Sequence, residues 1–186
     1  MSRLALNRTP IDDLRVIERK PIGDSRGFLE RLFCQETLDH LLLGKTIRQV
    51  NRTHTQKKGT VRGLHFQHPP HAETKIVTCL KGQVWDVAVD LRQGSPTFLK
   101  YHAVLLTGDN RQSYLIPAGF AHGFQTLTSD CEMLYLHTAD YHAEAEGALN
   151  ALDPRLAIGW PETISERSER DVSHAMLTDN FNGFPL

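Results

Sequence analysis

Short segments in which apolar and polar residues alternate dominate the middle of this 186-residue chain. Between about Ile47 and Thr138, each such segment ends at Gly, Pro, Asn or Asp. Strands are therefore predicted at Ile47–Asn51, Thr60–Gln67, Lys75–Leu80, Gln83–Leu91, Thr97–Leu106, Gln112–Ile116, Gly123–Leu127 and Met133–Thr138. Short strands with frequent turn residues are typical of an antiparallel sandwich or barrel.

The clearest alternation lies in Gln83–Leu91, where successive side chains of a strand point to opposite faces. One face collects only apolar side chains, which are Trp85, Val87, Val89 and Leu91. The other face mixes apolar residues with carboxylates, in the order Val84, Asp86, Ala88 and Asp90. We expect the first face to build a core and the two carboxylates to face the barrel mouth or water.

Helical spacing is rare in this chain. Leucines recur at helical intervals within Gln35–Leu43, and Gly44 follows as a stop signal, so a helix is predicted there. A second, shorter helix is predicted at Ser165–Asp171, with Ser165 as its N-cap. The tail Thr178–Leu186 is expected to form an arm without regular structure.

The first part of the chain is less regular. Gly27–Cys34 is predicted to be a strand, and Pro21–Asp24 has the composition of a turn. The spacing in Ile11–Ile17 is ambiguous between helix and strand.

Composition and charge limit the possible partners. The chain has 21 Lys+Arg against 22 Asp+Glu, so it lacks the basic field that general nucleic-acid binding requires. No apolar run reaches the roughly 18 residues of a membrane helix, and Met1–Pro10 lacks the apolar core of a signal peptide. The three cysteines are scattered without a zinc-binding spacing. We therefore expect a cytoplasmic protein with reduced thiols and no membrane or nucleic-acid partner.

A polar row within Gly59–Gln67 suggests a strand that lines a pocket. Arg62, His65 and Gln67 stand there among apolar residues and glycines. Strict alternation puts His65 and Gln67 on one face and Arg62 on the other. Either a bulge at Gly63 re-aims one side chain, or the long Arg62 side chain reaches round from the far side.

A metal site is the first chemistry to weigh. The segment Pro117-x-Gly119-x-x-His122 resembles half of the cupin metal signature, but the other half would need His-x-His, and this chain has His65-Phe66-Gln67. Distant histidines (His54, His102 or His137) would have to complete the ligand set, and nothing in their spacing indicates this. We therefore expect no metal and no cofactor.

Metal-free acid/base chemistry is the second possibility. It requires a base, an acid on the opposite face of the substrate, a carboxylate that orients the base, and a cation beside the developing negative charge. The candidates are His65 as base, Tyr135 as acid, Asp171 as orienting carboxylate and Lys75 as cation. The residues alone leave open whether these four groups converge.

Several longer motifs then occur in a fixed order along almost the whole chain. They are Asp24-x-Arg26-Gly27, Gln49-x-Asn51, Val61-Arg62-Gly63-Leu64-His65-Phe66-Gln67, Asp86-Val87-Ala88-Val89-Asp90-Leu91-Arg92, Ser95-Pro96-Thr97-Phe98, Ile116-Pro117-x-Gly119-Phe120-Ala121-His122-Gly123-Phe124 and Asp153-Pro154 to Trp160-Pro161. With these motifs in this order, the sequence closely resembles the dTDP-4-dehydrorhamnose 3,5-epimerase family of the cupin superfamily.

The resemblance implies a fold and a reaction. It implies a mainly β protein, an antiparallel jelly roll or cupin barrel with a few short helices. Residues 1–186 would form one cupin-like epimerase domain, with an N-terminal strand region and a C-terminal helical arm. Members are usually homodimers that exchange N-terminal strands. They invert C3 and/or C5 of a nucleoside-diphosphate 4-keto-6-deoxy sugar without a metal or cofactor.

The resemblance also assigns roles to residues of this chain. His65 matches the base, Asp171 its paired carboxylate, Tyr135 the acid on the opposite face, and Lys75 a cation near the sugar oxygen. Six further positions resemble the nucleotide- and sugar-contacting set, namely Arg26, Gln49, Asn51, Arg62, His122 and Tyr141.

Four positions depart from the family pattern: Leu136, His142, Arg31 with the preceding Glu30, and Ala151. We expect them near the sugar and nucleotide ends of the site, which leaves the reaction type intact and the product open. The alternatives are a C3-only epimerase on another nucleotide sugar, a non-catalytic cupin that binds a nucleotide sugar, and a metal-dependent cupin oxygenase.

Overall fold

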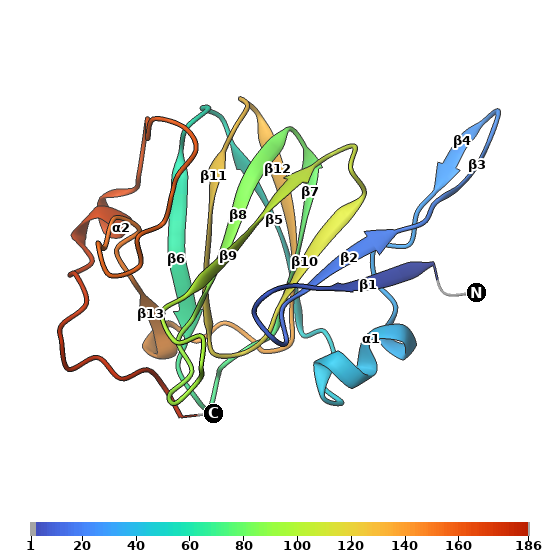
Figure 1. Ribbon diagram of the computed structural model, residues 1–186. Coiled ribbons are helices and arrows are strands. Elements are labelled where there is room, and N and C mark those ends of the chain that lie inside the picture. The colour runs from blue at the N-terminus through green and yellow to red at the C-terminus, as the bar shows by residue number, and fades with distance from the viewer. Residues whose placement is uncertain (1–2, 186) are drawn as a thin grey trace.

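The computed structural model describes residues 3–185, which form two antiparallel sheets packed face to face (Figure 1). The larger sheet has six strands in the order β1–β2–β10–β7–β12–β5. Its strands are β1 (Leu4–Arg8), β2 (Arg15–Arg19), β10 (Gln112–Ile116), β7 (Lys75–Lys81), β12 (Cys131–His137) and β5 (Gln49–Thr55). The smaller sheet has five strands in the order β13–β6–β11–β8–β9. They are β13 (Glu146–Ala148), β6 (Val61–Gln67), β11 (Phe120–Thr126), β8 (Gln83–Asp90) and β9 (Tyr101–Thr107).

The remaining elements are short. A hairpin of β3 (Ile22–Asp24) and β4 (Gly27–Leu29) extends away from both sheets (Figure 1). The helices are α1 (Gln35–Leu42), the 3₁₀ turn η1 (Ala143–Ala145) and α2 (Glu169–Ser173). Among the described residues, no helix combines the length and the apolar character that a membrane span requires.

Apolar side chains are buried in three layers. The layer between the sheets includes Val77, Val84, Leu106, Phe124 and Met133. A second layer lies on the outer face of the five-stranded sheet, where Val87, Val89 and Leu91 pack against the later segments of the chain, for example Leu156 and Phe181. A third lies on the outer face of the six-stranded sheet, where the helix residues Leu38 and Leu42 pack against Ile76, Leu115 and Leu136.

Most predicted strands of the middle region are confirmed, with shifted ends. The strand predicted at Gly123–Leu127 begins earlier, at Phe120. The strand predicted at Thr97–Leu106 begins only at Tyr101, because the Thr97 hydroxyl donates to Asp90 at 2.7 Å and holds a turn there. The helix predicted at Gln35–Leu43 is confirmed as Gln35–Leu42, with Leu43 in a left-handed conformation as its C-cap.

Three predictions near the ends of the chain are wrong in part. Pro21–Asp24, which has the composition of a turn, contains the strand β3 (Ile22–Asp24). The strand predicted at Gly27–Cys34 stops at Leu29, because Glu30 turns back to pair with Arg19 at 3.2 Å. The later helix begins after Ser168, not Ser165, and Ser168 Oγ accepts the N–H of Asp171 at 3.0 Å. The tail predicted at Thr178–Leu186 carries no regular element over its described residues, and Leu186 lies outside them.

The prediction for the second face of Gln83–Leu91 is also wrong in part. Asp86 and Asp90 are fully buried, so neither carboxylate faces water. Asp86 pairs with His122, while Asp90 accepts hydrogen bonds from Arg92, Ser95 and Thr97. Both faces of β8 are buried because a sheet packs against one face and the later chain segments against the other.

Candidate active site

A cavity of about 700 Å³ opens between the two sheets. Side chains of β5, β7 and β12 form one wall, and those of β6 and β11 form the other. The segment around α2 closes one side. The cavity brings together nine of the ten predicted site residues, which are Gln49, Asn51, Arg62, His65, Lys75, His122, Tyr135, Tyr141 and Asp171.

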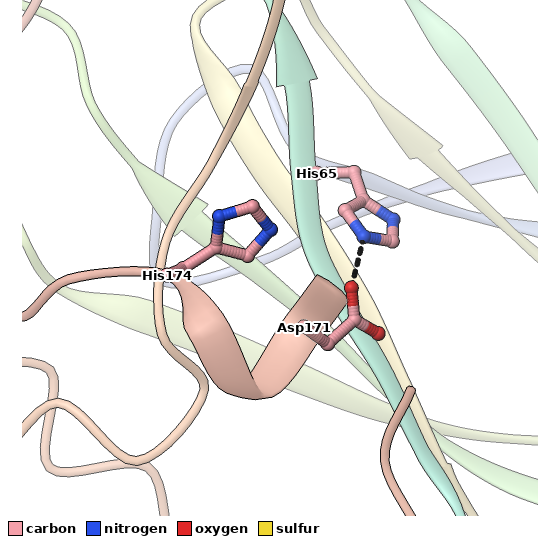
Figure 2. A group of neighbouring side chains, drawn as sticks. All are labelled: His65, Asp171 and His174. Carbon is pink, nitrogen blue, oxygen red and sulfur yellow. Dashed lines mark hydrogen bonds and ion pairs between the residues drawn. The ribbon is translucent and has the colours of Figure 1, made fainter. Parts of the chain in front are cut away.

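A hydrogen-bonded imidazole and carboxylate lie at the β6 wall (Figure 2). His65 Nε2 is 2.7 Å from Asp171 Oδ1, and the Gly63 N–H donates to Asp171 Oδ2 at 3.2 Å. Burial opposes ionisation of this carboxyl group, but the hydrogen bonds from His65 and Gly63 outweigh it and lower the pKa of Asp171. With Asp171 ionised, His65 carries its proton on Nε2. Its Nδ1, which points away from Asp171 in Figure 2, keeps the lone pair that a base needs.

The start of α2 holds Asp171 in place. Ser168 is an N-cap whose hydroxyl oxygen accepts the Asp171 N–H at 3.0 Å. The Asp171 carbonyl accepts a hydrogen bond from Arg167 at 2.6 Å. Backbone contacts on both sides of the residue therefore aim its carboxylate at His65, although the two residues are 106 positions apart.

A bulge in β6 explains how Arg62 and His65 reach the same cavity. Opposite β11, Arg62 pairs with Phe124 and His65 pairs with His122, so two residues of β6 stand opposite one of β11. The extra residue lies at Gly63–Leu64, and Gly63 has a φ of +123°. The predicted bulge is thus confirmed, and the alternative that Arg62 reaches round from the far face is unnecessary.

A buried ion pair lies beside His65. Lys75 Nζ is 3.1 Å from Glu73 Oε1 and donates to the His65 carbonyl at 3.2 Å. Burial opposes ionisation of Glu73, yet His137 and Lys75 outweigh it and lower the pKa of this carboxyl group. Gln67 donates to the other Glu73 oxygen at 3.0 Å, which fixes the carboxylate and leaves the Lys75 ammonium at the cavity wall.

Tyr135 stands on β12, in the sheet opposite to His65. Burial, together with the nearby Asp86 carboxylate, raises the pKa of Tyr135, so its hydroxyl keeps its proton at neutral pH. The ring is held between two imidazoles, stacked on His137 at 6.1 Å and edge-on to His122 at 6.0 Å. The cavity therefore has a protonated phenol on one sheet and a basic imidazole on the other.

The other residues predicted to contact the substrate also line the cavity, and they differ in their hydrogen-bond partners. His122 Nε2 is 2.9 Å from Asp86 Oδ1, and burial raises the pKa of that carboxyl group although His122 opposes the shift. Gln49 accepts the Tyr141 N–H at 3.1 Å, which joins the β5 wall to the loop after β12. Asn51 follows Gln49 on the same face of β5.

Arg26 is the exception among the predicted site residues. It lies at the β3–β4 hairpin, 88% exposed, and pairs with Asp24 of the same hairpin. It does not line the cavity of its own chain. The prediction that Arg26 joins the other contacts is therefore not met within one chain.

Several ionisable residues of the cavity are not among the predicted site residues, namely Glu73, His137, Glu146, Arg167 and Arg170. Strand alternation contains a signal for two of them, because Glu73 precedes Lys75 by two positions and His137 follows Tyr135 by two. The two arginines lie in and beside the short α2, where no periodicity indicates which side chains face the cavity.

None of the four departures from the family pattern, all of them described residues, lines this cavity. Leu136 packs in the layer under α1, and Ala151 packs in the layer outside the five-stranded sheet. Glu30, beside the exposed Arg31, pairs with Arg19. The expectation that these changes gather at the sugar and nucleotide ends is therefore wrong for a single chain.

Comparison with known proteins agrees with this architecture. A family model described as dTDP-4-dehydrorhamnose 3,5-epimerase matches residues 8–179. The Escherichia coli K12 dTDP-4-dehydrorhamnose 3,5-epimerase is 42% identical over 168 residues, which cover 88% of this chain and 90% of the relative.

Two solved structures are similar over most of the chain. One is the Legionella pneumophila dTDP-6-deoxy-D-glucose-3,5-epimerase in complex with dTDP-4-keto-L-rhamnose, with a TM-score of 0.90, 39% identity and 98% of each chain covered. The other is a 3′-monoepimerase from Streptomyces bikiniensis in complex with dTDP-quinovose, with a TM-score of 0.83, 30% identity, and 90% of this chain and 85% of that chain covered. The predicted antiparallel, cupin-like fold is confirmed, and the chain is an isomerase that belongs to the dTDP-4-dehydrorhamnose 3,5-epimerase family.

Proposed function

We propose that this protein inverts C3 and C5 of a nucleoside-diphosphate 4-keto-6-deoxy sugar, of the dTDP-4-dehydro-6-deoxyglucose type, by enolisation without a metal or cofactor. The observation that carries the proposal is that His65 and Tyr135 project from opposite sheets into one cavity. An inversion needs a base on one face of the carbon and an acid on the other. The nucleotide sugar in the similar Legionella structure supports the substrate class.

Each residue has one role in this mechanism. The 4-keto group acidifies the hydrogens on C3 and C5, and His65 Nδ1 removes one of them. Asp171 stabilises the imidazolium that forms, and the Lys75 ammonium stabilises the enolate oxygen. Tyr135 then donates its proton to the opposite face of the carbon. Water removes the proton from His65 and returns one to Tyr135, so the enzyme ends each turnover unchanged.

Binding of the substrate involves the other candidates. Gln49, Asn51, Arg62, His122 and Tyr141 hold the sugar and the nucleotide, with Arg62 on the diphosphate, where a guanidinium makes paired hydrogen bonds. Because none of the four family departures lines the cavity, they give no reason to choose a different sugar.

The assembly that we propose is a cytoplasmic homodimer of a single cupin-like domain, residues 1–186. The β3–β4 hairpin supports it, because Phe28 and Leu29 are 68% and 72% exposed and extend away from the sheets (Figure 1). In the dimer the hairpin covers its apolar side chains on the partner and brings Arg26 to the partner's cavity.

Deuterium exchange tests the reaction. The protein is incubated in deuterated water with dTDP-4-keto-6-deoxyglucose and with related nucleotide sugars, and the products are examined by mass and proton spectra. We expect deuterium at C3 and C5. If neither carbon of any of these sugars gains deuterium, the proposal is wrong.

Inversion at C3 only is the second candidate. It is favoured by one observation, the similarity of the whole fold to a 3′-monoepimerase. The same spectra separate the two candidates, since one deuteron marks one exchanged centre and two deuterons mark both.

A further inference from the structure

His174, which has no role in the proposed mechanism, lies next to the His65–Asp171 pair. It follows α2 directly and stands three positions after Asp171, so both side chains lie on one side of that turn (Figure 2). One donor atom from each of His65, Asp171 and His174 lies within 4.8 Å of the other two. Within the described part of the chain, His174 Nε2 is shielded from solvent and has no hydrogen-bond partner.

We propose that these three side chains form an inhibitory binding site for a borderline divalent transition ion such as Zn²⁺. Two imidazoles and one carboxylate suit Zn²⁺, Ni²⁺ or Cu²⁺ better than Mg²⁺ or Ca²⁺, which prefer all-oxygen sites. In such a site, the unpartnered His174 Nε2 would also coordinate the ion. The inhibitory effect rests on the proposed function, whereas ion binding does not.

The surroundings hold the site in shape. The Asn150 amide donates to the His174 carbonyl at 2.8 Å, and Arg167 donates to the Asn150 side chain at 2.8 Å. The Gly63 N–H donates to Asp171 Oδ2 at 3.2 Å and holds the carboxylate in place. The charge of Arg170, the nearest cation on α2, is balanced by its ion pair with Glu146.

Ion binding would remove the base. A tetrahedral zinc ion with bonds near 2 Å holds its donor atoms about 3.3 Å apart, so the 2.7 Å hydrogen bond between His65 and Asp171 must open. The ion takes the Nε2 lone pair, and the proton of neutral His65 moves from Nε2 to Nδ1. Nδ1 then carries a hydrogen and cannot accept one from the sugar. The ion therefore inhibits proton abstraction without touching Tyr135.

A second group of possible ligands, His71, His142 and Glu144, provides a matched control. Its donor atoms also lie within 4.8 Å of one another, and His142 Nδ1 is 3.2 Å from Glu144 Oε1. The group stands outside the cavity, and the Glu144 carboxylate is exposed, so an ion bound there leaves His65 untouched.

Zinc titration of the chelator-treated enzyme tests the site. Exchange is measured for the unaltered protein, His174→Asn, His174→Gln and His142→Asn, and each is scaled to its own rate without metal. For the unaltered protein, we expect zinc to stop exchange and Mg²⁺ to have no effect. Both His174 variants should need at least about tenfold more zinc for the same inhibition, since even outer-shell changes cost 10–100-fold in metal affinity. His142→Asn should respond like the unaltered protein.

Three results would overturn the proposal. They are no inhibition at saturating zinc, unchanged zinc inhibition in both His174 variants, or a loss of zinc inhibition in His142→Asn as large as that in the His174 variants. Equilibrium dialysis against zinc separates this from failure of the proposed function. If the metal-free protein catalyses no exchange, the function is wrong, but loss of one bound zinc per chain in both His174 variants still supports the site. Equal zinc binding in all four proteins contradicts it. Thermal unfolding identifies any variant that is not folded.

Discussion

At the scale of single residues, the proposed base and the proposed acid lie in different environments. His65 is hydrogen-bonded to an ionised carboxylate, while Tyr135 is buried among imidazoles and apolar side chains. The first environment favours a group that accepts a proton, and the second keeps a phenol protonated. Removing each group should therefore affect a different step.

We predict that Tyr135→Phe separates exchange from inversion. His65 remains able to abstract the proton, so deuterium still enters from solvent on the face of the base. Inversion should fall by about 10²-fold or more, because general acid catalysis is lost. Deuterium content by mass spectrometry and configuration by proton spectra give the two rates.

The matched control is Tyr101→Phe, which removes a hydroxyl that contacts the Gly159 N–H outside the cavity. It should alter neither rate. If Tyr135→Phe lost exchange and inversion together, Tyr135 would have to serve in proton abstraction as well.

Asp171 leads to a prediction about pH and stability. The pKa of Asp171 in the folded protein is lowered from the ordinary value of 3.8. The ionised carboxylate therefore makes its full contribution to the stability of the fold at pH values above the ordinary pKa. This stabilisation is lost as the pH falls through the lower folded value. Asp171→Asn should cost about 1–3 kcal/mol near pH 7 through its buried hydrogen bonds, and the cost should shrink in acid.

Urea unfolding at several pH values measures this difference. Asp24→Asn is a suitable control, because its pKa is also lowered but the residue is exposed in the hairpin, where ion pairs contribute little. A cost for Asp171→Asn that stayed constant below the ordinary value would contradict the assigned ionisation.

At the scale of elements, the β6 bulge decides which side chains share the cavity. Gly63 and Gly123 face each other at this point: a Cβ on Gly63 would lie 2.6 Å from Gly123 Cα and 2.8 Å from the His122 carbonyl oxygen. Backbone atoms cannot move aside as a flexible side chain can. The close approach of β6 and β11 therefore requires glycine in both strands.

We predict that Gly63→Ala destabilises the protein by about 2 kcal/mol or more and lowers exchange, because the Gly63 N–H also holds Asp171. Gly94→Ala is the matched control. Gly94 also has a positive φ, of +76°, but its added Cβ meets nothing within 4 Å. It should cost only the roughly 1 kcal/mol of backbone strain and leave exchange unchanged. Equal losses in both variants would show that backbone conformation, and not strand contact, governs the site.

Strand alternation predicted most of the central strands well, since these have a side packed in a core layer. It placed β5 less well, at Ile47–Asn51 instead of Gln49–Thr55, because the side chains of this strand are mostly exposed. The alternation did not predict β1, β2 or β13. These strands are short and are stabilised mainly by the strands beside them. It also placed Asp86 and Asp90 at a mouth or in water, because a sequence does not show that His122 and Arg92 will pair with them. The chemistry of the residues named the catalytic candidates, and the family motifs matched them to roles. Their convergence depends on the bulge and on the Ser168 cap, neither of which periodicity can locate.

At the scale of the whole molecule, one chain contains the cavity but not the complete set of predicted contacts. Among the described residues, Arg26 lies outside the cavity, and Phe28 and Leu29 of the same hairpin stay largely exposed. In the proposed homodimer each cavity uses residues of both chains. This arrangement makes a prediction that a monomeric enzyme cannot meet.

We predict complementation between two impaired variants, Arg26→Ala and His65→Asn. In a mixed dimer, the cavity of the Arg26→Ala chain retains His65 and receives an intact hairpin from the other chain. Exchange by the mixture, after co-expression or unfolding and refolding together, should exceed the average of the two separate variants. The control is Arg26→Ala mixed with itself under the same treatment. Activity equal to the average would contradict a shared site.

The long separation between His65 and Asp171 has a consequence for biosynthesis. All strands of the two sheets have left the ribosome once β13 has emerged, and the chain then already includes Tyr135 and Lys75 of the cavity. The carboxylate that orients the base arrives only with α2, 106 residues after His65. A chain whose translation stops before α2 would thus lack both the carboxylate that pairs with His65 and part of the wall that closes the cavity. Proteolytic removal of the same segment should silence the enzyme, and it should also uncover Val87, Val89 and Leu91 on the outer face of the five-stranded sheet.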